Sequence, residues 1–370
     1  MTLRPPRSSL GHVAVTQKVR DGAWRVVELI TTPVVPADYL DVIAPLRNPT
    51  VLRARIDAVR PETAKAVTLV LRPGRGWQPH RPGQYVRLGV DVDGVRLWRA
   101  YSVSSAAGRA DGRFTVTVNA VENGVVSSYL LKNARKGMLV HLDLPDGEFL
   151  LPEQRPAKAL FVTAGSGITP VMGMLRSALH ELSDVVVVHS ARTAEDVVFG
   201  AELRDLAAQG RIRLIERHTL ADGRLKPDGL ADLVPDLFER ETWACGPGQL
   251  LDDLEEHWAD AGVADRLHIE RFRTVVLVAG DGGTVTFEKS GLVVDAPGGT
   301  SILEAGEAAG QLMKSGCRMG ICYKCVLPMR EGIVRDLRDG TITTASEVDG
   351  DKPLIQTCIS AAAGPCRIDA

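Results

Sequence analysis

Four cysteines near the C-terminus constrain the fold of this chain more than any other feature. The spacing C-x4-C-x2-C-x32-C joins Cys317, Cys322, Cys325 and Cys358. Three thiolates on one loop and a fourth from elsewhere in the same domain are the ligand arrangement of a [2Fe-2S] cluster. Gly316 and Gly320 let the backbone of this loop wrap closely around the sulfur atoms and donate N–H groups to them. The pattern therefore predicts a cluster-binding domain and, with it, electron transfer.

Structural zinc and disulfides are the alternative uses of these cysteines. Zinc sites usually pair cysteines as two separate C-x2-C units, which this spacing does not follow. Disulfides are disfavoured because the N-terminus shows no secretory signal pattern, and all six cysteines of the chain fit a reducing compartment. The leftover Cys366 is interpreted as a small packed hydrophobic residue.

Length and composition exclude several classes of protein. A chain of 370 residues should hold two or three domains. A net charge of -2 argues against a nucleic-acid partner, and a content of 45% hydrophobic and 24% charged residues is that of an ordinary soluble protein. The longest apolar runs are far too short to cross a bilayer, so no transmembrane segment and a cytoplasmic location are expected.

The first segment, residues 1–48, is punctuated by prolines and is predicted to be an N-terminal extension. It carries one short helix candidate over residues 37–44, opened by Pro36 and ended by Pro45. The favoured interpretation is a surface strap that packs on the next domain. Docking to a partner or to the inner face of the membrane is the alternative.

Two different strand patterns follow. Residues 49–151 contain short alternating strands with turn signals, as at 51–56, 85–90 and 114–118, which indicates an antiparallel β-barrel. Residues 152–273 alternate apolar strands with helical segments, with strands expected at 159–162, 185–188, 212–215 and 242–244. That alternation is typical of an α/β domain with a parallel sheet.

A glycine-rich linker over residues 274–283 separates these segments from the last domain, residues 284–370. A hairpin, a helix over residues 302–309 and the cysteine loop are expected there. The chain is thus predicted to be a multidomain protein with a barrel, an α/β domain and a C-terminal cluster domain.

The barrel segment contains two candidate ligand motifs. Arg99-Ala-Tyr101-Ser102 is expected just after a strand that ends at Trp98, where the three side chains offer a phosphate counter-charge, a stacking plane and a hydrogen bond to a ring nitrogen. The alternative is an exposed arginine beside a half-buried tyrosine. About 20 residues further on, Gly124 to Ser127 resembles a turn entering a helix N-terminus, which favours a pyrophosphate. Ser127 is expected to be the N-cap of that helix.

Two glycine loops stand in the α/β segment. Gly165 and Gly167 run from a strand into a helix that begins near Thr169, and a tight turn there exposes the helix N-terminus to a phosphate-bearing ligand. Cys245 and Gly246 again follow a strand and precede a helix. Both loops should lie at the carboxyl edge of one sheet, and together they predict a dinucleotide crevice.

In this order, the motifs from residue 50 to 370 resemble the ferredoxin-NADP reductase superfamily with a fused C-terminal plant-type ferredoxin. Pro82-Gly-Gln-Tyr85 opens the series and Cys245-Gly-Pro-Gly248 closes its reductase part. The resemblance implies a flavin-binding barrel, an NAD(P)-binding α/β domain and a β-grasp [2Fe-2S] domain, which pass electrons from a reduced nicotinamide through a flavin and the cluster to an acceptor protein.

The resemblance also implies roles for individual residues. Arg99, Tyr101 and Ser102 would hold the flavin ring and phosphate, and the turn of Gly124, Val126 and Ser127 would hold the pyrophosphate. The nicotinamide nucleotide would lie on Gly165, Gly167, Thr169, Cys245 and Gly246, while Glu270 and Phe272 of the closing segment would approach the flavin. Ser102, Cys245 and Glu270, in that order, are the expected surroundings of hydride transfer, which depends mainly on holding the donor carbon close to the flavin.

The choice of cofactors is predicted from fewer residues. Ser190 and Arg192 follow the second strand of the α/β segment, where a hydroxyl and an arginine suit a ribose 2'-phosphate, so NADPH is favoured over NADH. FAD is favoured over FMN because of the Gly124 to Ser127 turn.

A finer resemblance concerns the acceptor. The stretch from Cys317 to Arg338 and the N-terminal segment around Tyr39 are similar to actinobacterial reductases of membrane fatty-acyl desaturases. A membrane diiron desaturase is therefore the predicted acceptor. The alternatives are a ring-hydroxylating dioxygenase, an alkane hydroxylase or other diiron oxygenase, a haem monooxygenase or, in another class, a redox sensor without turnover.

Overall fold

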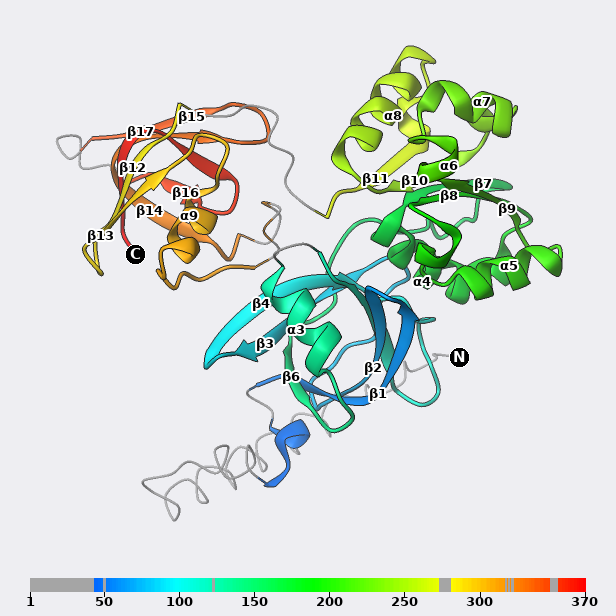
Figure 1. Cartoon of the computed structure of the whole chain (residues 1–370), viewed down its shortest axis with the longest axis horizontal. Helices are drawn as coiled ribbons and strands as arrows, with labels where there is room; N and C mark the ends of the chain where they lie inside the picture. The colour runs from blue at the N-terminus through cyan, green and yellow to red at the C-terminus, as the bar shows by residue number, and fades with distance from the viewer. Residues whose placement is uncertain are drawn as a thin grey trace, which may run out of the picture.

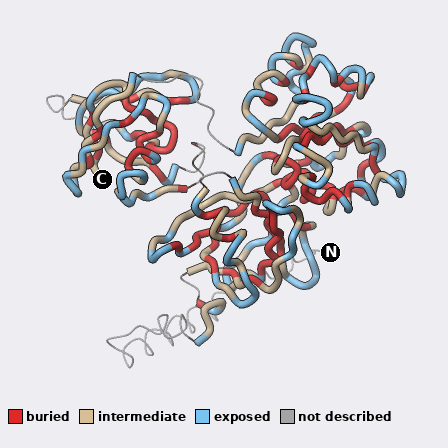
Figure 2. Tube along the Cα trace, in the orientation of Figure 1, coloured by how far each residue is buried: buried red, intermediate tan, exposed pale blue. Residues whose placement is uncertain are grey.

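The computed structural model describes residues 43–48, 51–121, 124–272, 281–316, 318, 320, 323–346 and 352–370. They form three bodies that follow one another along the chain (Figure 1). Buried residues gather in the interior of each body (Figure 2), as expected for three separately packed domains.

The first body is an antiparallel barrel. Its strands are β1 (Arg53–Thr63), β2 (Ala66–Pro73), β3 (Tyr85–Val92), β4 (Val95–Ser102), β5 (Phe114–Asn119) and β6 (Leu139–Leu142), in the order β4-β3-β6-β1-β2-β5. An antiparallel bridge between Val103 and Val116 joins the two ends of this sheet, which closes the barrel. Helix α3 (Val125–Asn133) contributes Leu130, fully buried, to the barrel core. The predicted antiparallel barrel is confirmed.

The second body is a parallel sheet covered on both faces. Its strands are β7 (Lys158–Ala164), β8 (Asp184–Ala191), β9 (Arg213–His218), β10 (Glu241–Cys245) and β11 (Leu267–Glu270), in the order β11-β10-β7-β8-β9. Helices α4 (Ile168–Ala178) and α5 (Gly200–Ala208) pack on one face, and α7 (Leu230–Leu233) and α8 (Gly248–Asp260) on the other. Both faces are buried, which explains the continuous apolar runs of β7 and β8 and confirms the α/β prediction.

Glycines allow the barrel and the α/β domain to approach at backbone distance. A Cβ on Gly173 of α4 would lie 2.3 Å from the Val103 carbonyl oxygen, and one on Gly83 would lie 2.6 Å from the Cε of Met174 on α4. The Arg176 guanidinium donates to the Ser104 carbonyl oxygen at 2.5 Å. These close approaches fix α4 against the end of β4.

The C-terminal body is a mixed sheet with one helix. Strands β12 (Gly283–Phe287), β13 (Leu292–Ala296), β14 (Val326–Asp336), β15 (Ile342–Ala345) and β17 (Ser360–Ile368) follow the order β13-β12-β17-β14-β15, and β16 (Leu354–Gln356) pairs with β14. The β12–β17 pair is parallel and the others are antiparallel. Helix α9 (Ile302–Ala308) begins at the Ser301 N-cap, whose side chain accepts from the Glu304 N–H, and buries Ile302 against the sheet core. This is the β-grasp arrangement that the sequence predicted.

Short helices complete the described part of the chain. They are α6 (Thr219–Asp222), η1 (Pro45–Arg47), η2 (Gly165–Gly167), η3 (Leu179–Glu181), η4 (Ala194–Asp196), η5 (Pro227–Gly229), η6 (Leu237–Glu239) and η7 (Ala264–Arg266). Among the residues that the structure describes, no helix is long and apolar enough to span a bilayer.

Three local predictions need correction or fall outside the described residues. Arg99, Tyr101 and Ser102 lie inside β4 and not after it, because the pairing with β3 continues to Ser102. Gly124, and not Ser127, is the N-cap of α3. The helix predicted over 37–44 lies almost entirely outside the described residues, and Pro45 opens the short helix η1.

Candidate functional site

Strand β4 presents Arg99 and Tyr101 on one side, since the two residues are separated by one position. The Arg99 Nη1 donates to the Trp98 carbonyl oxygen at 2.8 Å, and the side chain is half-buried. Burial, followed by the nearby charge of Arg318, lowers the pKa of the Arg99 guanidinium. The half-buried Arg99 guanidinium and the nearby Arg318 together favour an anionic ligand, as the predicted contact of Arg99 with the flavin phosphate requires.

Ser102 ends β4 at the seam with the α/β domain. Its side chain is buried, with a residue exposure of 4%, and its Oγ has no hydrogen-bond partner among the described residues. A buried hydroxyl without a partner costs stability, so the position suits a ligand atom that would complete it. Gly173 contacts the backbone of Val103, the residue after Ser102, so α4 lies directly beside the end of β4.

Cys245 and Glu270 are neighbours on parallel strands β10 and β11, at the carboxyl edge of the sheet. Burial raises the pKa of the Glu270 carboxyl to about 8, and its Oε2 has no partner in the described structure. Burial and the Glu270 charge raise the pKa of the Cys245 thiol. Both groups are therefore protonated at neutral pH, and neither acts as an ionised nucleophile or base in the resting protein.

The two glycine loops meet at the same edge. Gly165 has φ +56°, and a Cβ on Gly167 would lie 1.9 Å from the Cys245 carbonyl oxygen. Thr169 in the first turn of α4 donates its hydroxyl to the Ser166 carbonyl oxygen at 2.9 Å. The loop after β7 thus contacts the loop after β10, as a dinucleotide crevice at the end of a parallel sheet requires.

The turn before α3 leads into a helix N-terminus, as predicted, but Gly124 and not Ser127 is the N-cap. The Ser127 Oγ donates to the Gly124 carbonyl oxygen at 3.3 Å and accepts from the Val121 N–H at 3.4 Å. The Val126 side chain packs in the barrel core, so a ligand contact at Val126 would come from its backbone N–H. Backbone N–H groups at this helix start remain the donors suited to a pyrophosphate.

The predicted ribose-phosphate residues lie at the carboxyl end of β8, on the β9 side of the same sheet. Ser190 is buried near the end of β8 and pairs in register with Arg217 of β9, while Arg192 is exposed just beyond β8. The register places Arg217 beside Ser190, and the Arg217 Nη2 donates to the Asp222 carbonyl oxygen at 3.1 Å. Phe272, with 38% of its surface exposed, follows β11 and lies near the opposite edge.

Two of the four predicted cluster ligands lie within the described residues. Cys325 and Cys358 are buried, and their sulfur atoms lie 3.2 Å apart, far longer than a disulfide bond of about 2.05 Å. Two converging thiols without a covalent bond fit a shared metal centre. The predictions for Cys317 and Cys322 lie outside the described residues. Gly320 has φ +77°, and a Cβ there would lie 2.7 Å from the Arg338 Nη1, so only glycine fits this point of the loop.

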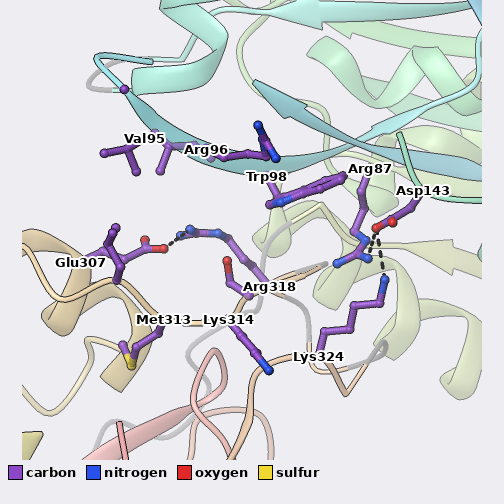
Figure 3. A pocket seen from close by; sticks show the side chains of 14 residues that line it. Arg87, Val95, Arg96, Trp98, Asp143, Glu307, Met313, Lys314, Arg318 and Lys324 are labelled. Carbon is purple, nitrogen blue, oxygen red and sulfur yellow. Dashed lines mark hydrogen bonds and ion pairs between the residues drawn. The ribbon is translucent and has the colours of Figure 1, made fainter. Parts of the chain in front are cut away.

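Sequence reasoning missed a group of charges between the barrel and the C-terminal domain. Arg87, Asp143, Arg318 and Lys324 line a cavity of about 660 Å³ there, together with Trp98 (Figure 3). Arg318 and Lys324 are intervening positions of the cysteine motif, whereas Arg87 and Asp143 belong to no motif; nothing in the sequence indicates that the four residues meet.

Comparisons with known proteins agree with this architecture. Residues 78–150 match the family model of the oxidoreductase FAD-binding domain, residues 161–256 that of the oxidoreductase NAD-binding domain, and residues 285–363 that of the 2Fe-2S iron-sulfur cluster binding domain. An NADPH oxidoreductase of Mycobacterium tuberculosis is 47% identical over 352 residues, which cover 93% of this chain and 91% of that protein.

Two further relatives are more distant. The ferredoxin reductase component of a 3-ketosteroid-9-alpha-monooxygenase of Mycolicibacterium smegmatis is 32% identical, covering 77% of this chain and 87% of that protein. The solved structure of phthalate dioxygenase reductase superimposes with a TM-score of 0.60 at 23% identity and covers 86% of this chain and 98% of its own, a likeness of fold.

The matched domains identify FAD, a nicotinamide nucleotide and a [2Fe-2S] cluster as the cofactors of this oxidoreductase. The buried polar atoms of Ser102 and Glu270, the close glycine loops and the converging thiols of Cys325 and Cys358 fit these groups. The chain therefore belongs to the oxidoreductase family that joins an FAD-binding, an NAD-binding and a 2Fe-2S cluster-binding domain in one polypeptide.

Proposed function

We propose that this protein is an NADPH-dependent reductase that delivers single electrons to a separate acceptor protein. The observation that carries the proposal is the position of β4, which has the α/β domain at its Ser102 end and the C-terminal domain beside Arg99. A ligand held along this strand would have a nicotinamide site at one end and the cluster domain at the other.

When bound, the nicotinamide supplies a hydride, the flavin converts a two-electron donation into single electrons, and the cluster carries one electron at a time. The chain's own residues position these groups. The Ser102 hydroxyl offers a buried hydrogen bond to a ring atom, and Cys245 packs a neutral thiol beside the nicotinamide position. The Glu270 carboxyl stays protonated and would lie next to the flavin ring. These roles require placement and exclusion of water, and no strong base.

NADPH is the proposed electron donor. A relative that is 47% identical bears the name NADPH oxidoreductase, and Ser190 with Arg217 supplies a hydroxyl and a guanidinium at the sheet edge where a ribose 2'-phosphate would bind. Arg192, exposed beyond β8, lies within the same stretch of chain.

An oxygenase component is the acceptor that we propose. One relative is named as the reductase component of a 3-ketosteroid monooxygenase, and another is a glycine betaine monooxygenase reductase subunit of Pseudomonas aeruginosa. The finer prediction from the sequence, a membrane diiron fatty-acyl desaturase, stays a prediction to be tested beside it. The predicted cytoplasmic location is likewise a proposal.

The test is an anaerobic titration of the purified protein with NADPH and, separately, with NADH, followed by absorbance and low-temperature EPR. Bleaching of the flavin bands together with a rhombic [2Fe-2S] signal at lower NADPH than NADH concentration is the expected result. A protein that neither nucleotide reduces would contradict the proposal and favour a sensing role for the cluster. Reduction of an oxygenase, compared with a desaturase, then ranks the acceptors.

A further inference from the structure

An ion pair joins the cluster loop to the barrel. Lys324, the residue directly before the predicted ligand Cys325, places its Nζ 3.2 Å from the Oδ2 of Asp143, which follows β6 (Figure 3). The two residues are 181 positions apart in the sequence. The contact therefore exists only when the C-terminal domain is docked on the barrel.

The Asp143 carboxylate is held in place before any docking. The Arg87 side chain, buried within the barrel, donates from its Nη2 to the same Asp143 oxygen, and its guanidinium lies 5.6 Å from the centre of the Trp98 ring on β4. A buried arginine that is fixed both by a carboxylate and by an aromatic ring has little freedom to move. Arg87 thus presents Asp143 as a fixed anion on the barrel surface.

A second observation brings the same loop to the flavin-binding strand. Arg318, next in sequence to the predicted ligand Cys317, is near enough to Arg99 of β4 to lower the pKa of that guanidinium, and it pairs with Glu307 of α9. Arg318 therefore lies near the part of β4 assigned to the flavin phosphate, and Lys324 contacts the barrel at Asp143.

This contact differs in kind from the seam between the barrel and the α/β domain. There, glycines bring backbones together, whereas a cavity of about 660 Å³ separates the barrel from the C-terminal domain around the charged residues. The Lys324 side chain is about half exposed in its pair with Asp143, so salt weakens this contact between the two domains.

We propose that Lys324 is a positioning residue for electron transfer from the flavin to the cluster. Its ion pair with Asp143 holds the C-terminal domain against the barrel beside β4. This inference rests on the proposed function and adds to it the contact on which the internal transfer depends.

Zero-length cross-linking with a carbodiimide tests the contact without any turnover. The reagent joins a lysine amine and a carboxylate as an amide when the two are in direct contact, and peptide mass spectrometry locates the bond. The chain holds an internal control, because Lys289 Nζ lies 3.2 Å from Asp369 Oδ1 within the C-terminal domain. We expect both bonds to form at low salt, and only the Lys324–Asp143 bond to diminish at about 1 M salt, where the Debye length is about 3 Å. Formation of the Lys289–Asp369 bond alone at low salt would overturn the proposal.

Anaerobic stopped-flow measurements with NADPH test the consequence. In Lys324→Gln, which leaves the Arg87–Asp143 pair intact, bleaching of the cluster after the flavin should slow about two- to fivefold, the range expected for loss of one partly exposed ion pair. In Asp143→Asn, which also removes the carboxylate that faces the buried Arg87, the slowing should be at least as large. Flavin bleaching and reduction of ferricyanide should keep their wild-type rates. Asp111→Asn breaks an ion pair with Arg109 outside the cavity lining, and Lys289→Gln removes the control pair; both should behave as wild type.

The outcomes separate this inference from the proposed function. Wild-type cluster bleaching with wild-type salt dependence in both Asp143→Asn and Lys324→Gln would refute the role of the ion pair and leave the reductase function standing. A wild-type protein whose flavin NADPH does not bleach would instead refute the proposed function itself. The EPR signal of chemically reduced Lys324→Gln verifies that its cluster is assembled.

Discussion

Replacing Glu270 by Gln should remove a strong pH dependence from the stability of the α/β domain. Burial raises the pKa of this carboxyl to about 8 from an ordinary value of 4.5. Between these two values the unfolded chain has lost the proton and the folded chain keeps it, so the folded state binds more protons. Stability from this residue is therefore full below about pH 4.5 and falls as the pH rises through about 8.

The size of the effect follows from the same shift. Each pH unit well inside the window costs about 1.4 kcal/mol, and less near pH 8, so raising the pH from about 5.5 to about 7.5 should lower the free energy of unfolding by about 2.5 kcal/mol more in the wild type than in Glu270→Gln. Urea unfolding of the holoprotein, followed by the fluorescence of the fully buried Trp243 and Trp258 in this domain, measures the difference.

A matched variant separates burial from loss of charge. Glu256 is exposed on α8 in the same domain, and Glu256→Gln should keep the wild-type dependence of stability on pH. If Glu270→Gln and the wild type lost stability equally between the two pH values, the carboxyl would be ionised in the folded protein. The assignment of a neutral Glu270 beside Cys245 would then be wrong.

Three further changes have definite expected outcomes. Cys358→Ser should abolish the EPR signal of the reduced cluster and the reduction of a protein acceptor, while NADPH-dependent reduction of ferricyanide survives. If the EPR signal and the reduction of the protein acceptor both persisted, Cys358 would not be a cluster ligand. Gly167→Ala should weaken NADPH binding by at least about tenfold in calorimetry, because its Cβ would lie 1.9 Å from the Cys245 carbonyl oxygen. Arg217→Gln should raise the Kd for NADPH about tenfold and leave that for NADH within about twofold, as a charged contact to a 2'-phosphate predicts; equal effects on both nucleotides would exclude that contact.

Local patterns in the sequence were enough to predict the barrel and the α/β domain, whereas the β-grasp domain was implied by the family resemblance. Short alternating strands marked the barrel, and continuous apolar strands such as β7 marked a sheet buried on both faces. The glycine loops were predictable for the same reason: both follow a strand directly, and the carboxyl ends of parallel strands meet at one edge.

The errors arose where pairing partners decide the structure. Arg99-Ala-Tyr101-Ser102 lacks an apolar alternation, so the strand was expected to end at Trp98; in the structure Tyr85 of β3 pairs with Ser102 and extends β4 to the end of the motif. At α3 the Ser127 hydroxyl turns back to the Gly124 carbonyl, which leaves the cap position to Gly124.

The contact between Lys324 and Asp143 could not be predicted at all. Lys324 is an intervening position of the cysteine motif and Asp143 belongs to no motif, and no periodic pattern relates positions 181 residues apart. Only the folded chain brings them together, with Arg87 behind the carboxylate. Functional contacts between domains are therefore the part of this site that sequence reasoning is least able to supply.

The two neighbours of β4 differ in how firmly they are held, and this difference bears on where the rate of electron delivery is set. At the Ser102 end, a Cβ on Gly173 would lie 2.3 Å from the Val103 carbonyl oxygen, so α4 packs directly on the backbone after β4 and the α/β domain keeps a fixed position relative to the strand. Beside Arg99, the C-terminal domain meets the barrel across a cavity and through exposed charges such as Lys324. A domain held in this way can leave the barrel at small cost and present the cluster to an acceptor protein. We therefore expect salt to change the flavin-to-cluster step while leaving hydride transfer at the Ser102 end unaffected.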